Sequence, residues 1–564
     1  MSEESVWDII DRPTFFGSLI LLLAVTLPLV FFPEQGAYWV DASRGWLTES
    51  LGSLYLMLGA GAFGFMIFII FSDIGQIKLG EPEEEPEFAT QSWAAMLFCA
   101  GIGASILYWG VIEWAYYYQS PPFNIPGGSP EAAQWAAAYG IFHWGPLAWA
   151  IYLIPAMPMA YFYYVRNHSV LKLSEALLPV LGEKYARNWL GKFIDILLIF
   201  GMLGGGATTL GFAAPLINEG LYELFDIPVT LSSRIAILFV CTAIFGYSAF
   251  VGLKKGIKLL SDINFWLAVC LLSFVFIVGP TRFMLETGLD SIGRVLDNLI
   301  HMATWTASFS DFDKFGKSHF PQDWTIFYWA WWLGFAPCVG VFIARISRGR
   351  TIKSMVAGAM FFGSMGCAAF FVVLGNYAMY LQLSGILDVI DILNNQSATA
   401  AIFAVLRELP FSTIIVGGFT LLAVIFTATT FDSISYILAA VAQREVDEEP
   451  VRWNRLFWAF TLSFMPMVLM FVGGLETLQT ASIVGGAPLL IIALLLCVSM
   501  VRAAHYDLRY QPSYEDKAIH IEELPDADPW SAEGSWDLPV DDSHAEHADK
   551  PHVEGDPHSH PSRL

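Results

Sequence analysis

Aromatic side chains form two clusters in this chain, at spacings that would let them bind a ligand together. The run WAWWLGFAPCVG carries Trp331 and Trp332, and Phe335 follows them at i+4 and i+3. At helical spacing the three rings share one broad face. Facing π systems bind a cation, and a quaternary ammonium needs them because it has no N–H to donate to a carboxylate. This face therefore predicts binding of an onium group.

A second aromatic cluster occurs in the run HWGPLAWAIY. Trp149 and Tyr152 are i, i+3 neighbours, and Trp144 lies close enough around the helix for all three to border one cavity. A lone Trp or Tyr in an apolar run more often anchors the protein at the membrane surface. Two clusters on two apolar runs, one of them interrupted by helix breakers, favour a shared binding cavity.

The composition of the chain indicates that these rings lie on transmembrane helices. The chain has 564 residues, of which 55% are hydrophobic and only 14% charged, and its apolar runs repeat at lengths near 20 residues. Such runs predict an all-α polytopic membrane protein with twelve transmembrane helices. We predict spans near 15–33, 53–72, 93–113, 141–164, 190–215, 234–253, 263–281, 324–345, 357–377, 411–431, 455–473 and 480–502.

The distribution of charge predicts the orientation of the chain. The eighth span ends in a basic cluster running from Arg345 to Lys353, and alternate loops carry most other Lys and Arg residues. Basic loops stay in the cytoplasm, which places both termini there. Much of the net charge of −23 lies in EPEEEPE at 81–87 and in the tail. An acidic total argues against nucleic acid as a partner.

Several classes of function are excluded by missing motifs. The sequence has no Walker loop, no HExxH and no nucleophile elbow, so neither an enzyme nor a cofactor is predicted. The six cysteines fall inside apolar runs without metal-ligand spacing and are expected to be buried free thiols. The acidic N-terminus lacks the basic region of a cleaved signal peptide.

Two spans contain helix breakers at matching places. The third reads CAGIGASILYWG and the eighth WWLGFAPCVG. They lie five spans apart, which predicts two inverted five-helix repeats with unwound turns around a midplane site. The alternative is that these glycines serve close helix packing. No Lys or Arg occurs within spans 3, 4 or 8 before Arg345, so the N–H groups near Gly101, Ile102 and Gly103 are candidates to bind a substrate carboxylate.

The remaining segments complete the predicted organisation. LDNLIHMATWTASF within 282–323 is amphipathic and predicts a helix in the interface plane, unless it is an ordinary connecting helix. The acidic, His-containing tail predicts a solvated, disordered segment. The predicted parts are an N-terminal cytoplasmic segment (1–14), two additional transmembrane helices with an acidic loop (15–92), a first repeat (93–281), an interfacial helix and loop (282–323), a second repeat (324–502) and the tail (503–564).

The pattern WAWWxxxxPxxGxFIARISRGRTI, which begins at Trp329, resembles the signature of the betaine/choline/carnitine transporter family. The resemblance covers residues 10–505 or so. It implies a secondary transporter with the leucine-transporter-like fold of two inverted five-helix repeats. It also implies a homotrimer in the bacterial inner membrane. The substrate would be glycine betaine, carnitine, choline or dimethylsulfoniopropionate.

The resemblance also assigns roles to residues. It implies an aromatic box built from the two clusters, with Tyr108 added from the third span. Members specific for betaine commonly carry Trp where this chain has Phe335, so the substrate size is open. The segment LYWGVIEWAYYY looks more like the carnitine branch. Glu113 and His143, the other polar groups at depth, are interpreted as hydrogen-bond partners between helices.

Sodium is the coupling ion that the resemblance implies. The family's sodium ligands correspond to Thr429 and Thr430 on the tenth span, with backbone carbonyls near Ala100 and Ile102, and we add the carbonyl of Phe426. Capping or back-bonding is the alternative role for these threonines.

Two further comparisons bear on coupling. Sodium-independent exchangers of the family carry an Arg on the seventh span, whereas this chain has SDINFW there, which favours symport. Met202 and Gly206 stand at the family's second sodium site, which leaves that site in doubt. The rival hypotheses are a sodium-independent carnitine/betaine exchanger and a membrane sensor that binds its ligand without transporting it.

Overall fold

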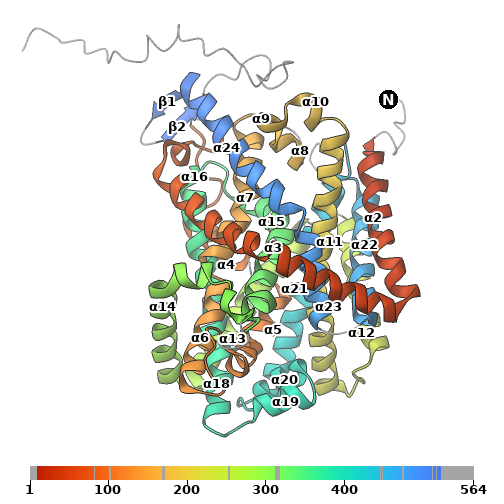
Figure 1. Cartoon of the computed structure of the whole chain (residues 1–564), viewed down its shortest axis with the longest axis vertical. Coiled ribbons are helices and arrows are strands. Elements are labelled where there is room, and N and C mark those ends of the chain that lie inside the picture. Colours follow the sequence, from red (N-terminus) through yellow and green to blue (C-terminus); the bar gives the residue numbers. More distant parts are fainter. Residues whose placement is uncertain are drawn as a thin grey trace, which may run out of the picture.

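The computed structural model of the chain describes residues 9–81, 83–100, 103–167, 172–251, 254–311, 318–444, 446, 449–472, 475–510, 512–515 and 518–521. These residues form a bundle that consists almost entirely of helices (Figure 1). Short helices α8, α9 and α10 and a two-stranded hairpin lie at one end, and α18, α19 and α20 lie at the other.

The helices differ widely in length because apolar runs continue through some turns and are interrupted at others. In the first half they are α2 (Arg12–Phe31), α3 (Pro33–Phe71), α4 (Thr90–Ala100), α5 (Ala104–Gln119), α6 (Pro130–His143), α7 (Pro146–Tyr164), α8 (Leu173–Ala176), α9 (Leu178–Leu181), α10 (Glu183–Ala186), α11 (Trp189–Phe225), α12 (Leu231–Val251), α13 (Lys254–Val278) and α14 (Thr281–Thr304). In the second half they are α15 (Ile326–Ile346), α16 (Ile352–Gly358), α17 (Ser364–Phe370), α18 (Asn376–Leu383), α19 (Val389–Asn395), α20 (Ala398–Arg407), α21 (Ser412–Val441), α22 (Arg452–Val472), α23 (Leu475–Gly486) and α24 (Leu489–Tyr510).

Shorter elements complete the described chain. Single 3₁₀ turns occupy Asp73–Gln76 and Ser308–Asp311. Wider π-helical turns occupy Pro321–Thr325, which leads into α15, and Ala359–Gly363 and Phe371–Gly375, which flank α17. Two antiparallel strands, β1 (Pro512–Glu515) and β2 (Ala518–Ile521), pair Pro512 with Ile521.

Each predicted span falls on a helix or on consecutive helices. In the part of the chain that the structure describes, nine helical segments are long and apolar enough to cross a membrane. A tenth is counted if α13 and α14, bent by 111°, are taken as one span. The remaining predicted spans coincide with α4–α5 and α12, which are shortened by a break or by the limits of the described residues. The all-α polytopic membrane fold is therefore confirmed.

The third span is broken as predicted, but the eighth is not. Helix α4 ends at Ala100 and α5 begins at Ala104, with Gly103 extended between them. Helix α15 runs without interruption and contains Pro337. Its glycine Gly334 lets α11 approach, since a Cβ there would lie 3.0 Å from the backbone oxygen of Gly201. The expected unwound turn in the eighth span is wrong, because its glycines serve close helix packing.

The fourth span contains a break that the sequence analysis did not predict. Helix α6 ends at His143, and α7 begins at Pro146 after an extended Gly145. Proline is well suited to the first turn of a helix because its missing N–H needs no partner there. The Gly–Pro pair was the available signal for this break.

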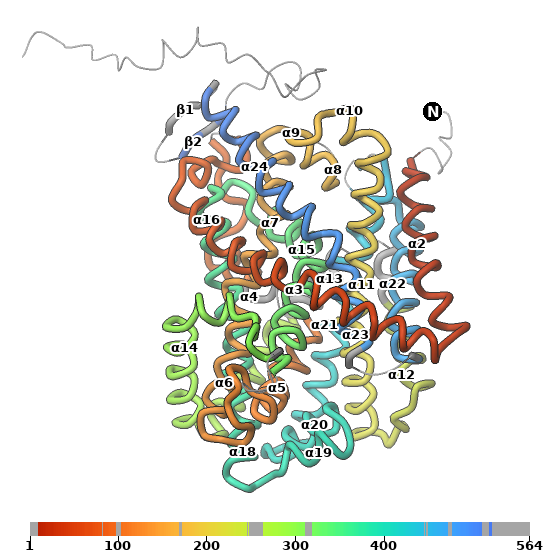
Figure 2. The backbone as a smooth tube through the Cα atoms, in the orientation of Figure 1, coloured from red at the N-terminus to blue at the C-terminus, as the bar shows by residue number. Residues whose placement is uncertain are grey.

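Helix α14 lies at the edge of the bundle (Figure 2). It packs against α6, where Arg294 stands 4.8 Å from the ring of Trp135. Its opposite side leaves a stripe of large apolar side chains exposed. The stripe contains Leu285, Leu289, Ile292, Leu296 and Ile300. This helix is amphipathic as the sequence predicts.

The beginning of the predicted disordered tail is ordered instead. Helix α24 continues to Tyr510. In its last turns, Asp507 forms an ion pair with Arg166, and the distance from Nη2 of Arg166 to Oδ1 of Asp507 is 2.6 Å. The hairpin then pairs Ile519 with Ile77, and the backbone of Lys78 donates to Ile519. Disorder from residue 503 onward is therefore wrong for these segments, because a buried charge and a strand pairing hold them. Residues 522–564 lie outside the described residues.

Candidate functional site

The indoles of Trp331 and Trp332 form the centre of the predicted aromatic box. They stack on α15 with ring centroids 4.7 Å apart and an interplanar angle of 15°. The Nε1 of Trp331 donates to the backbone oxygen of Gly205 on α11 at 3.1 Å. The Nε1 of Trp332 donates to the backbone oxygen of His143 at 2.9 Å. Because protein acceptors use both N–H groups, the ring planes are fixed and the π faces are what the rings offer to a ligand.

Three rings of the fourth span join this pair. Trp144, in the break between α6 and α7, packs edge-on against Trp332 at 4.7 Å and lies 5.9 Å from Trp331. Tyr152 lies 5.7 Å from Trp332, and Trp149 lies 5.7 Å from Tyr152. All five side chains are buried. The structure thus brings together five of the predicted ring residues from two spans.

Phe335 and Tyr108 are placed differently. Phe335 is only partly buried, and its backbone nitrogen faces α11, 3.3 Å from where a Cβ of Gly205 would stand. Tyr108 packs on Phe212 at 5.0 Å, and Phe212 lies 5.7 Å from Trp331. Tyr108 therefore reaches the box through Phe212, which the sequence analysis missed. The signal for Phe212 was a single aromatic residue closing the glycine-rich run of the fifth span.

The buried side chain of Glu113 lies behind the aromatic box and binds its neighbours. The carboxylate of Glu113 on α5 accepts three hydrogen bonds. Its Oε2 accepts from Trp144 Nε1 at 3.1 Å and from the Tyr328 hydroxyl at 2.6 Å. Its Oε1 accepts from the Tyr117 hydroxyl at 2.6 Å, and that hydroxyl lies 2.9 Å from Nδ1 of His143. Glu113 and His143 thus join three helices, as the sequence interpretation expected.

A glycine of the ninth span fixes the far ring of the box. A Cβ at Gly363 would come within 2.2 Å of the indole of Trp149, closer than real Cβ atoms approach. Since Gly363 is helical, its backbone conformation does not require glycine. Space for the ring is therefore what requires glycine at this position. Hydropathy gives no sign of this contact.

The threonines predicted to bind sodium lie beside the break in the third span. The hydroxyls of Thr429 and Thr430 both donate to the backbone oxygen of Phe426, at 3.1 and 2.8 Å. A Cβ at Gly103 would lie 3.5 Å from Oγ1 of Thr430. Each hydroxyl oxygen keeps lone pairs suited to a hard cation. The Phe426 carbonyl, by contrast, is occupied by the two hydroxyls.

Other predicted groups near the break in the third span are backbone groups of residues 100–103 and the carboxylate of Asp432. Ala100 ends α4, whereas Gly101 and Ile102 lie outside the described residues. Asp432, two residues beyond the threonines, forms an ion pair with Arg455 on α22. Its carboxylate is therefore used to join α21 and α22.

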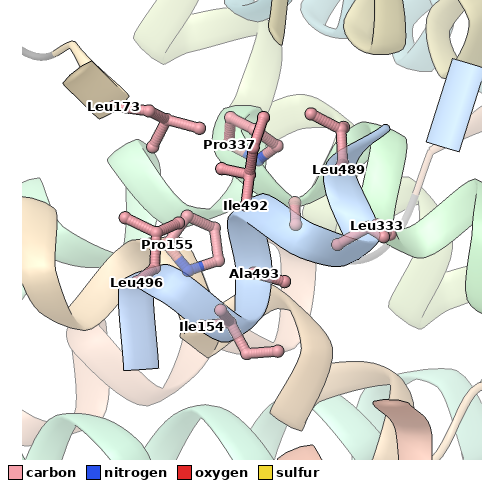
Figure 3. Close-up of a pocket in the computed structure, with 10 residues that line it drawn as sticks. Ile154, Pro155, Leu173, Leu333, Pro337, Leu489, Ile492, Ala493 and Leu496 are labelled. Atoms are coloured by element: carbon pink, nitrogen blue, oxygen red, sulfur yellow. The ribbon is translucent and has the colours of Figure 1, made fainter. Parts of the chain in front are cut away.

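A separate, small apolar pocket lies between α7, α15 and α24 (Figure 3). Leu333 and Pro337 line it from the face of α15 opposite Trp331. The other lining residues are Ile154, Pro155, Leu173, Ala336, Leu489, Ile492, Ala493 and Leu496. This lining offers no charge or polar side chain, so its chemistry differs from that of the aromatic box.

Comparisons with known proteins identify the family of the chain. A model of the BCCT family, the betaine/carnitine/choline family transporters, matches residues 13–509. The chain is 34% identical over 457 residues to the uncharacterized transporter YeaV of Escherichia coli (strain K12), a match that covers 80% of this chain and 93% of YeaV.

A solved structure of a Na⁺-coupled sialic acid symporter, in a substrate-bound outward-open state, is also similar. It matches 80% of this chain and 83% of its own, at 12% identity and a TM-score of 0.37. At this level of similarity it identifies neither a substrate nor an ion for this chain.

Proposed function

Since the chain belongs to the BCCT family of transporters, we propose that it imports an onium compound by sodium symport. It is a multi-pass membrane protein and not an enzyme. The candidate substrates are glycine betaine, carnitine, choline and dimethylsulfoniopropionate. Alternating access would open the aromatic box first to one side of the membrane and then to the other.

The convergence of rings around Trp332 is the observation that carries this proposal. Its indole contacts the rings of Trp144, Trp331 and Tyr152, all buried. A desolvated aromatic contact with a cation contributes about 2 kcal/mol. Because the rings of Trp331 and Trp332 are already stacked, an onium ion must either separate them or occupy an outer face. Opening and closing of the box is therefore part of the proposed cycle.

Sodium coupling is supported by the place of the threonine hydroxyls. Thr430 lies beside Gly103, at the break that separates α4 from α5. A cation bound there would link α21 to the broken third span, whose second helix, α5, carries Tyr108 and Glu113. Occupancy of the ion site would thereby favour one arrangement of the box. This coupling is the physical basis that we propose for symport.

The position in the membrane follows from the same premise. We propose the bacterial inner membrane, as the family resemblance implies, with both termini in the cytoplasm. The basic turn after α15 lies at the same end of the molecule as the hairpin of β1 and β2, and basic loops stay in the cytoplasm. The exposed apolar stripe of α14 suits contact with lipid or with a second copy of the chain. We propose that it contributes to a homotrimer.

Uptake into proteoliposomes tests the proposal. Labelled glycine betaine, carnitine, choline and dimethylsulfoniopropionate are each offered with and without an inward sodium gradient. We expect uptake into empty vesicles that rises with sodium, and the preferred label identifies the substrate. Uptake only into vesicles preloaded with an onium compound, indifferent to sodium, would instead establish the exchanger. Saturable binding without any uptake would establish the sensor.

A further inference from the structure

The carboxylate of Glu113 lies directly behind the aromatic box. Its side chain is completely buried. Oε2 accepts from the indole N–H of Trp144, and the ring of Trp144 packs on Trp332. The carboxylate is therefore separated from the box interior by one indole.

The helices that supply the hydrogen-bond partners of this carboxylate carry no permanent positive charge next to it. Residues 79–165 and 318–344, which include α5, α6, α7 and most of α15, have neither Lys nor Arg. The basic side chain beside the carboxylate is His143, whose Nδ1 lies 3.8 Å from Oε1 of Glu113. His143 also lies 3.0 Å from the Thr325 hydroxyl through Nε2, so both ring nitrogens are engaged.

The hydrogen bonds around Glu113 suit its ionised form. Trp144 Nε1 is an obligate donor, and the hydroxyls of Tyr117 and Tyr328 are placed to donate as well. An ionised carboxylate is an acceptor only, so these three donors satisfy it without neutralising its charge. A buried negative charge whose hydrogen-bonding helices carry no Lys or Arg favours a cation that binds nearby, because the low dielectric screens the charge weakly.

We propose that Glu113 provides the counter-charge of the aromatic box and makes it select an onium ion over an uncharged molecule of the same shape. The inference rests on the proposed function and adds a specificity-determining residue to it. Glu113 acts through Trp144: the bond from Nε1 to a carboxylate enriches the indole face in electron density, and the charge itself acts across the ring. It also positions that ring, which no other residue of α5 does by a described hydrogen bond.

Paired ligands that differ only in charge test the proposal. Choline is compared with 3,3-dimethylbutanol, and glycine betaine with 3,3-dimethylbutanoate, in which carbon replaces the charged nitrogen. Affinities are measured by calorimetry on the purified full-length protein and on Glu113→Gln. The glutamine oxygen can still accept from Trp144, and its amide can donate to Tyr117. We expect the onium ligand to bind about 10-fold or more weakly to the variant, and the uncharged-head ligand to change less than about 3-fold.

Equal losses for both members of a pair, or no loss for either, would overturn the proposal, because a residue that only holds the helices does not distinguish them. Glu219→Gln is the matched control. That carboxylate on α11 is also buried but accepts from Thr399, away from the box, and its replacement should leave both affinities unchanged. Should the wild-type protein bind none of the four candidate onium compounds, the proposed function fails, and the inference fails with it. An onium preference that survives in Glu113→Gln overturns the inference alone.

A second pair of variants applies if Glu113→Gln is not recovered folded. Trp144→Phe removes the hydrogen bond from the indole to the carboxylate of Glu113. Trp332→Phe removes the hydrogen bond from the indole to the neutral backbone carbonyl of His143. Both variants keep a ring. We expect the ratio of onium to uncharged-ligand affinity to fall at least about 3-fold further in Trp144→Phe. Equal falls in the two variants would overturn the proposal.

Discussion

Replacing Trp332 by alanine removes the ring that joins the two halves of the box. The ring contacts Trp144 at 4.7 Å, Trp331 at 4.7 Å and Tyr152 at 5.7 Å. Loss of one desolvated cation–π contact costs about 2 kcal/mol, which is about 30-fold in affinity. Release of the neighbouring rings increases the loss. We therefore expect Trp332→Ala to weaken onium binding by at least about 30-fold and to abolish uptake at micromolar substrate.

Stability must be measured beside binding in this experiment. Removing a buried Trp costs about 3–5 kcal/mol of folding free energy, so the variant is first checked by thermal unfolding and gel filtration. Trp458→Ala is the matched control, because Trp458 on α22 is equally buried but packs against Phe15, away from the box. Calorimetry and proteoliposome uptake then compare both variants with the wild type. A folded Trp332→Ala protein that binds its substrate within about 3-fold of wild type would refute the aromatic box.

Two further changes test the neighbouring elements. Thr429→Ala with Thr430→Ala should raise the sodium concentration for half-maximal uptake about 10-fold, because two hard-cation ligands are lost. Thr427→Ala is the control, because it removes a hydroxyl of the same helix that is not predicted to bind sodium, and it should leave the sodium dependence unchanged. An unchanged sodium dependence in the double variant would place the ion elsewhere. Gly363→Ala should lower onium affinity and the melting temperature together, because the new methyl group displaces Trp149. We expect the folding free energy to fall by about 1–3 kcal/mol. Wild-type values of both affinity and melting temperature would show that the ring has room to move.

The sequence predicted the spans and the convergence of five aromatic side chains because both signals are local. Hydropathy over about 20 residues reports whether a segment can cross lipid. Helical spacing of Trp149 and Tyr152, three residues apart, predicts a shared face. The same reasoning interpreted Glu113 and His143 as partners between helices, since a polar group at membrane depth must find one. The prediction of an unwound turn in the eighth span was wrong, because the sequence does not distinguish a glycine that breaks a helix from one that allows a second helix to pack closely.

A polytopic membrane protein with aromatic rings suited to an onium group can be predicted from this sequence alone. Composition and spacing carry that information in each segment separately. The acceptors that hold those rings become known only from the folded chain. They are the carbonyl of Gly205 for Trp331, the carbonyl of His143 for Trp332 and the carboxylate of Glu113 for Trp144. These partners come from other helices, and their distances depend on how the helices pack. Packing is a property of many side chains at once, so no local pattern records it.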